Sequence, residues 1–96
     1  MQYALTTVTI TKGFKVWKEM ADNAKKEMDD ISMKILIAAT DVNDETKLYA
    51  IIEYADLEAV KEFMSRADVE EIRKNAGVLT ETTTMTLLNE PRLDFD

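Results

Sequence analysis

The chain has 96 residues, which is enough for one small domain with a modest hydrophobic core. Nineteen acidic residues against twelve basic ones give a formal net charge of −7, which repels phosphate backbones and anionic lipids, so neither nucleic acid nor a membrane is an expected partner. The sequence has no cysteine and no histidine, which excludes disulfides, thiol nucleophiles and the commonest metal ligands, and no cofactor is expected.

The first predicted element is a strand from Tyr3 to Ile10, which is rich in β-branched residues and is followed by turn-forming residues at 11–13. No basic residue precedes its apolar positions, so this start is not typical of a signal peptide or of a membrane span. We therefore expect a cytoplasmic protein.

The second predicted element is an amphipathic helix that begins at Phe14 and ends near Asp29 and Asp30. Its apolar residues, among them Trp17 and Met20, recur at spacings of three and four, with lysines and acidic residues between them. This pattern predicts one face packed on the rest of the protein and one face in water.

Two strands, at 32–40 and 48–55, are predicted next, joined by a charged hairpin loop. Both strands are nearly continuous apolar runs, which is typical of strands covered on both faces. Lys34 and Glu53 are isolated charges within them and are expected to pair across the hairpin. The alternative for Glu53 is burial without a partner, which would raise its pKa and suit it to carry a proton. The loop begins like a calcium-binding loop but lacks the required glycine and final glutamate, so no metal site is predicted.

A second helix is predicted after Asp56, a suitable N-cap residue, and its apolar face includes Phe63. A short helical turn follows, for which Asp68 and Glu71 have the spacing of a capping pair. Gly77 then suits the position just beyond a helix end.

The last predicted strand covers 79–88 and is stopped by Pro91, which leaves a C-terminal tail at 89–96. Threonines occupy alternate positions of this strand, and we expect the row to lie on one face near a subunit contact. The row consists of Thr80, Thr82, Thr84 and Thr86.

The order of these elements is βαββαβ, which predicts an α+β domain over residues 1–96 with a ferredoxin-like architecture. Right-handed crossovers place both helices on one face of a four-stranded antiparallel sheet. The other sheet face is then bare, although its strands are apolar, and such a face is too large to leave in water. We expect a second copy to cover it, giving a homodimer with a barrel-like core of two sheets.

Two segments carry a family resemblance: "GFKVWKEM" at 13–20 and "IIEYADLEAVKEFMSRADVEEIRKNAGV" at 51–78. With the element order, they resemble the dimeric α/β-barrel superfamily, whose ferredoxin-like homodimers include antibiotic-biosynthesis monooxygenases, muconolactone isomerases, haem-degrading enzymes and uncharacterised small proteins. The resemblance implies a hydrophobic cavity between the helices and the sheet, where the family binds small organic molecules. Glu53 and Ala59 match the monooxygenase pattern, but Phe63 stands in place of its histidine. Haem ligation or histidine catalysis by that route is therefore excluded.

The expected cavity residues are large apolar side chains and one arginine that suits a ligand carboxylate. These predicted ligand-binding residues are Phe14, Trp17, Met20, Tyr54, Phe63, Met64 and Arg73. For the aromatic residues the alternative is plain core or interface packing, and for the arginine it is exposure to water. Glu53 is the candidate catalytic residue.

Two functions remain open from the sequence, beside a purely structural dimer whose cavity is filled by its own side chains. The first is a homodimer that binds a small hydrophobic molecule, either fatty-acid-like or aromatic. The alternative is a cofactor-independent monooxygenase or isomerase in which Glu53 or a tyrosine transfers a proton. RNA-binding modules share the βαββαβ order, but the basic aromatic pattern that they use is missing from this acidic sequence.

Overall fold

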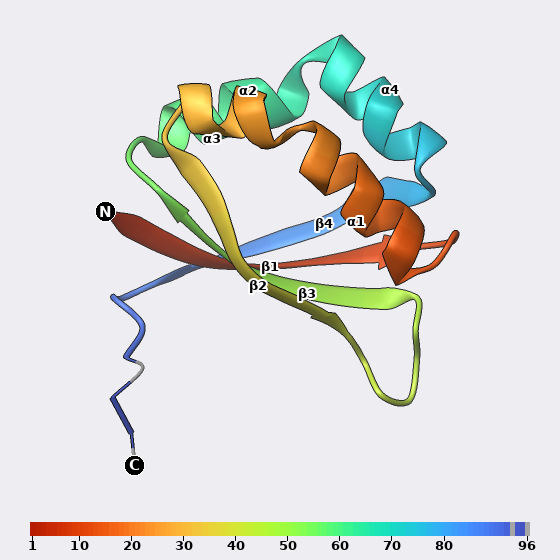
Figure 1. Cartoon of the computed structure of the whole chain (residues 1–96), viewed down its shortest axis with the longest axis horizontal. Helices are drawn as coiled ribbons and strands as arrows, with labels where there is room; N and C mark the ends of the chain where they lie inside the picture. Colours follow the sequence, from red (N-terminus) through yellow and green to blue (C-terminus); the bar gives the residue numbers. More distant parts are fainter. Residues whose placement is uncertain (93, 96) are drawn as a thin grey trace.

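A four-stranded antiparallel sheet carries all the helices on one face (Figure 1). The computed structural model describes residues 1–92 and 94–95. The strands are β1 (Gln2–Ile10), β2 (Met33–Thr40), β3 (Lys47–Tyr54) and β4 (Val78–Leu88), in the sheet order β2-β3-β1-β4. The predicted α+β ferredoxin-like fold is confirmed, and each strand lies within one residue of its predicted bounds. The predicted tail forms no helix or strand at 89–92, and its residues 93 and 96 lie outside the described part of the chain.

The first predicted helix is divided in two within the described chain, and the second helix is followed by a further helix where a short turn was predicted. The helices are α1 (Phe14–Asn23), α2 (Lys25–Asp30), α3 (Leu57–Ser65) and α4 (Ala67–Asn75). The first break is at Ala24 (φ −92°, ψ 0°), and the second is at Arg66, whose backbone is extended (φ −61°, ψ 136°). The predicted short turn is therefore a nine-residue helix. The predicted cap by Asp68 and Glu71 is wrong, because Arg66 holds the cap position and its guanidinium donates to the Asp68 carboxylate at 2.6 and 3.1 Å.

The N-cap predicted for α3 is present. The Asp56 carboxylate accepts a hydrogen bond from the backbone N–H of Glu58 at 3.0 Å. We expect Asp56→Ala to lower the free energy of unfolding by about 1 kcal/mol, because the helix loses this partner for a free N–H group. Urea denaturation followed by circular dichroism measures the loss. Glu62→Ala, at an exposed position of the same helix, is the control, and an equal loss in both variants would contradict the capping role.

The core lies between the sheet and the helices, because alternate strand residues face the helices. In β3 these are Leu48, Ala50, Ile52 and Tyr54, all buried. One cluster of buried residues packs beneath α2, α3 and α4 and includes Tyr54, Val60 and Phe63. A second cluster, around Trp17, packs beneath α1.

The threonine row of β4 does not lie on one face. The pairing of β4 with β1 changes register between Thr9 and Thr7, and β4 contributes extra residues there. Such an irregularity re-aims side chains. Thr84, opposite Thr7, lies on the face away from the helices, whereas the Thr80 hydroxyl donates to Glu70 of α4 on the helix side at 3.2 Å. The prediction of a single threonine face is wrong for this reason.

The sheet face opposite the helices, called the open face here, is largely apolar. It includes Leu5, Ile51 and Leu88, whose positions follow from the strand pairing. Ile37 and Tyr49 on this face are 61% and 39% exposed. The chain thus leaves apolar surface in the middle of the sheet without a cover from its own helices (Figure 1).

Candidate functional site

A cavity of about 750 Å³ lies between the helices and the sheet. Every helix and every strand contributes residues to its wall. Its size falls in the range of pockets that hold small organic ligands. Most of the wall is apolar, and the charged side chains that reach it come from α2, α3, α4 and β4.

Five of the seven residues predicted to bind a ligand line this cavity. They are Trp17, Met20, Phe63, Met64 and Arg73. The helical period that places apolar side chains on the inward faces of α1 and α3 explains why the four apolar residues are grouped, and Arg73 reaches the wall from α4. Whether these residues contact a ligand remains a prediction.

Phe14 and Tyr54 lie away from the cavity wall, contrary to the prediction. Phe14, at the start of α1, packs against Trp17 with ring centroids 5.7 Å apart. Tyr54, at the end of β3, is 1% exposed and belongs to the core cluster beneath α2, α3 and α4. Both side chains pack against neighbouring residues in this way, which is the alternative that the sequence left open for aromatic residues.

Glu53 lies on the open face, on the opposite side of the sheet from the cavity. This position of Glu53 is a consequence of strand alternation, because its neighbours Ile52 and Tyr54 point into the core. The Tyr3 hydroxyl donates to the Glu53 carboxylate at 3.1 Å. The pKa of Tyr3 is raised, mainly by desolvation and to a smaller extent by this hydrogen bond. Lys34 is opposite Glu53 in the strand pairing, but no ion pair joins them in the described chain. Proton transfer by Glu53 to a molecule in the cavity does not fit this position.

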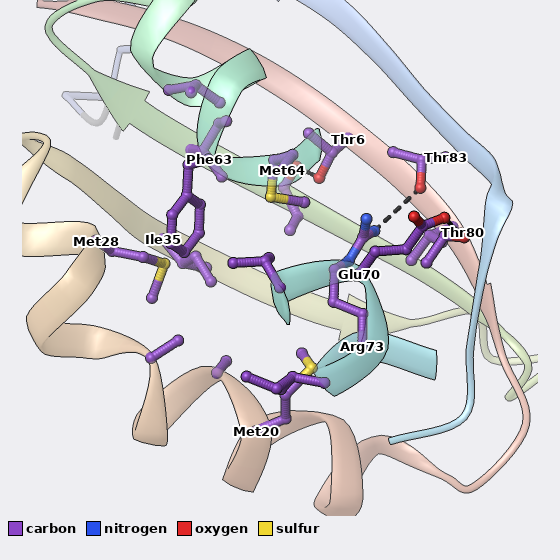
Figure 2. Close-up of a pocket in the computed structure, with 18 of the residues that line it drawn as sticks. Thr6, Met20, Met28, Ile35, Phe63, Met64, Glu70, Arg73, Thr80 and Thr83 are labelled. Carbon is purple, nitrogen blue, oxygen red and sulfur yellow. Dashed lines mark hydrogen bonds between the residues drawn. The ribbon is translucent and has the colours of Figure 1, made fainter. Parts of the chain in front are cut away.

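Methionine is the most frequent residue type on the cavity wall, whereas the sequence predicted only Met20 and Met64 there. Of the six methionines, all but Met1 line it. They are Met20, Met28, Met33, Met64 and Met85. In Figure 2, labelled methionines from α1, α2 and α3 surround the cavity. The thioether side chain is flexible and polarizable, so it adapts to the shape of an apolar guest.

One part of the wall is polar and is built by α4 and β4. Arg73 extends from α4, and its Nη2 donates to the Thr83 hydroxyl of β4 at 3.0 Å (Figure 2). Beside it, the Glu70 carboxylate accepts from Thr80 at 3.2 Å and pairs with Lys74 at 3.5 Å. Burial lowers the pKa of Arg73, which means that its guanidinium has lost part of its hydration. The sequence predicted Arg73 but neither Thr83 nor Glu70, since their proximity depends on how β4 pairs with β1.

The described residues contain neither a metal-binding cluster nor a helix that could span a membrane. No group of three or more acidic side chains is placed to hold a metal ion within residues 1–92 and 94–95. None of the helices in that part of the chain has the length and hydropathy needed to cross a membrane.

Several solved structures have the same fold. An antibiotic biosynthesis monooxygenase superposes with a TM-score of 0.64 at 14% identity, covering 96% of this chain and 100% of the other. Protein Atu4242 from Agrobacterium tumefaciens gives a TM-score of 0.61 at 11% identity, with 97% and 96% covered. An uncharacterised NIPSNAP domain protein from Burkholderia xenovorans gives 0.55 at 17% identity, with both chains fully covered. No model of a known family matches the sequence, and neither does any curated protein sequence. At these identities the likeness establishes the fold, as the resemblance to the dimeric α/β-barrel superfamily implied.

Proposed function

We propose that the protein is a homodimer that binds a small hydrophobic molecule, fatty-acid-like or aromatic, in the cavity between its helices and its sheet. The observation that carries this proposal is the cavity itself, about 750 Å³ in volume and walled by five methionines together with Trp17 and Phe63. A wall that is mostly apolar, with a few polar groups at one place, is the usual composition of a small-molecule site.

The dimeric part of the proposal rests on the open face. Its apolar residues, with Ile37 61% exposed, form a surface in the middle of the sheet that water would solvate poorly. A second copy placed on a twofold axis would cover the same face on both subunits at once. The open face is separate from the cavity, so binding and dimerisation can be tested independently.

Trp17 gives a direct test of binding, because it is the sole tryptophan and lies on the cavity wall at 9% exposure. We expect N-phenyl-1-naphthylamine, an uncharged apolar fluorophore, to bind and to quench Trp17 by energy transfer. Ala21→Phe should weaken probe binding at least about tenfold, because its ring would fill part of the cavity. Fluorescence titration measures both.

Ala67→Phe is the matched control, since Ala67 is exposed at the start of α4 and does not line the cavity. Its affinity for the probe should equal that of the wild type. A wild-type protein that does not bind the probe, or an equal loss in the two variants, would contradict binding in this cavity.

A second candidate is a cofactor-independent monooxygenase or isomerase. It is favoured by the likeness to the solved antibiotic biosynthesis monooxygenase. The position of Glu53 weakens this candidate, because the carboxylate that was predicted to transfer a proton lies across the sheet from the cavity. Oxygen consumption with a polyphenolic substrate separates binding from the monooxygenase, and the substrate's absorbance spectrum, which an isomerase would change without consuming oxygen, separates it from the isomerase. The binding proposal expects no consumption above that of the buffer, whereas saturable turnover would favour the enzyme.

A further inference from the structure

We infer that the ligand is a monocarboxylate with a flexible apolar chain, whose carboxylate pairs with the Arg73 guanidinium. The inference rests on the proposed binding function, since it assigns the head group and the chain of a molecule in the same cavity. Three features support it. Arg73 is partly buried and has no carboxylate partner in the described part of the chain, the charged residues beside it are already paired, and methionines line much of the remaining wall.

Arg73 is a cation on the cavity wall with most of its hydrogen-bonding capacity unused. A guanidinium has five N–H donors, and within the described residues one of them has a side-chain partner, the Thr83 hydroxyl. No carboxylate in that part of the chain lies within ion-pair distance of Arg73. Arg66 is different, since it pairs with Asp68 at 2.6 Å and with Glu27 at 3.3 Å.

Partial burial makes this state unfavourable without an anion. The lowered pKa of Arg73 reports that burial penalises its charged form, and the nearby Glu70 offsets only part of this. A carboxylate that enters the cavity would replace the lost hydration, because it can accept two parallel hydrogen bonds from the planar guanidinium. Thr83 holds one edge of that plane toward β4 (Figure 2).

The neighbouring charges leave room for one anionic group. Lys74 is paired with Glu70 at 3.5 Å, and Glu70 also accepts from Thr80. Glu81 lies on the same wall and would repel a second negative charge, as would the overall charge of −7. A single carboxylate therefore suits the site better than a phosphate or a dicarboxylate.

The remaining wall favours a flexible chain over a rigid ring system. Met28 and Met33 are buried, whereas Met20 and Met64 are half-buried on helices on opposite sides of the cavity. Unbranched thioether side chains rearrange around a guest at low cost, so they fit a chain that itself adopts many conformations.

Decanoate and its uncharged analogue methyl decanoate test the inference by displacing N-phenyl-1-naphthylamine from the intact protein. We expect decanoate to displace the probe, and Arg73→Gln to weaken decanoate at least about tenfold while leaving methyl decanoate unchanged. Arg73→Lys should recover only part of the affinity, because an ammonium does not offer the paired hydrogen bonds. Arg92→Gln is the control, since this arginine pairs with Asp94 at the surface, does not line the cavity and should leave both ligands unaffected.

The outcomes distinguish this inference from the proposed function. If the probe binds but Arg73→Gln changes decanoate and its ester equally, the carboxylate assignment is overturned and cavity binding stands. If 2-naphthoate binds more tightly than decanoate, the flexible chain is overturned. If neither the probe nor either decanoyl ligand binds the wild type, the proposed function fails and the inference fails with it. Probe affinity and circular dichroism of Arg73→Gln and Arg73→Lys verify that each variant is folded.

Discussion

Ile51→Lys is expected to convert the proposed homodimer into monomers. Ile51 lies in the middle of the open face, between Leu5 of β1 and Ile37 of β2. In a twofold dimer this substitution would place two ammonium groups within one apolar contact, and like charges there cost several kcal/mol. We therefore expect the dimer dissociation constant to rise at least about a hundredfold. Sedimentation velocity over a range of protein concentrations measures it.

Val42→Lys is the control for the added charge. Val42 is 94% exposed in the loop between β2 and β3, so the same chemical change there should leave the dimer intact. The variant at Ile51 should remain folded as a monomer, because its side chain is only half-buried in the subunit and lysine can extend along the sheet. A wild type that sediments as a monomer, or an Ile51→Lys protein that remains dimeric, would rule out the open face as the interface.

Gly77→Ala is expected to lower the free energy of unfolding by roughly 2–5 kcal/mol, a large part of the stability of a small domain. Gly77 follows α4 with φ +86°, a conformation that residues with a Cβ rarely adopt. An added Cβ would also lie 2.9 Å from the Lys12 backbone nitrogen and 2.9 Å from the Thr11 hydroxyl oxygen. These contacts are tight because the Gly77 carbonyl accepts hydrogen bonds from both the backbone N–H and the hydroxyl of Thr11.

Gly13→Ala separates the two causes. Gly13 also has a positive φ, +87°, but an added Cβ would meet no atom within 4 Å. It should therefore lose only the conformational part, about 1–3 kcal/mol. Urea denaturation of both variants measures the difference. Equal losses would show that the contacts with Thr11 and Lys12 add nothing to the cost.

The sequence predicted the fold well because hydrophobic period reports secondary structure directly. It did not predict the break at Ala24, which has neither the glycine nor the proline that usually marks a helix end. The division after the second helix was predicted, but with a cap at Asp68 and a short turn where the structure has Arg66 and a nine-residue helix. The threonine row was assigned to one face because strict alternation was assumed through β4, whereas its pairing with β1 shifts in register. Such a shift depends on which strands become neighbours, and this is not visible in a short stretch of sequence.

For the site, the same signal identified some wall residues and misplaced others. Period places Trp17 and Phe63 on inward faces, and both line the cavity. It also places Phe14 and Tyr54 inward, but it does not distinguish a side chain that lines a cavity from one that fills the core. The position of Glu53 could have been predicted from the sequence, because strand alternation places it on the opposite side of the sheet from the buried Tyr54.

The distribution of methionine gives this cavity a natural set of spectroscopic reporters. If the protein is produced in medium that contains methionine with a ¹³C-labelled methyl group, an NMR spectrum will show six labelled sites. Five of them lie on the cavity wall, and the sixth is Met1, which is 66% exposed. One spectrum would then follow α1, α2, α3, β2 and β4 together, with the N-terminal methyl as an internal reference. Because Met20 and Met85 belong to α1 and β4, while Met28 and Met33 belong to α2 and β2, shifts confined to one set would map where along the wall a guest molecule rests.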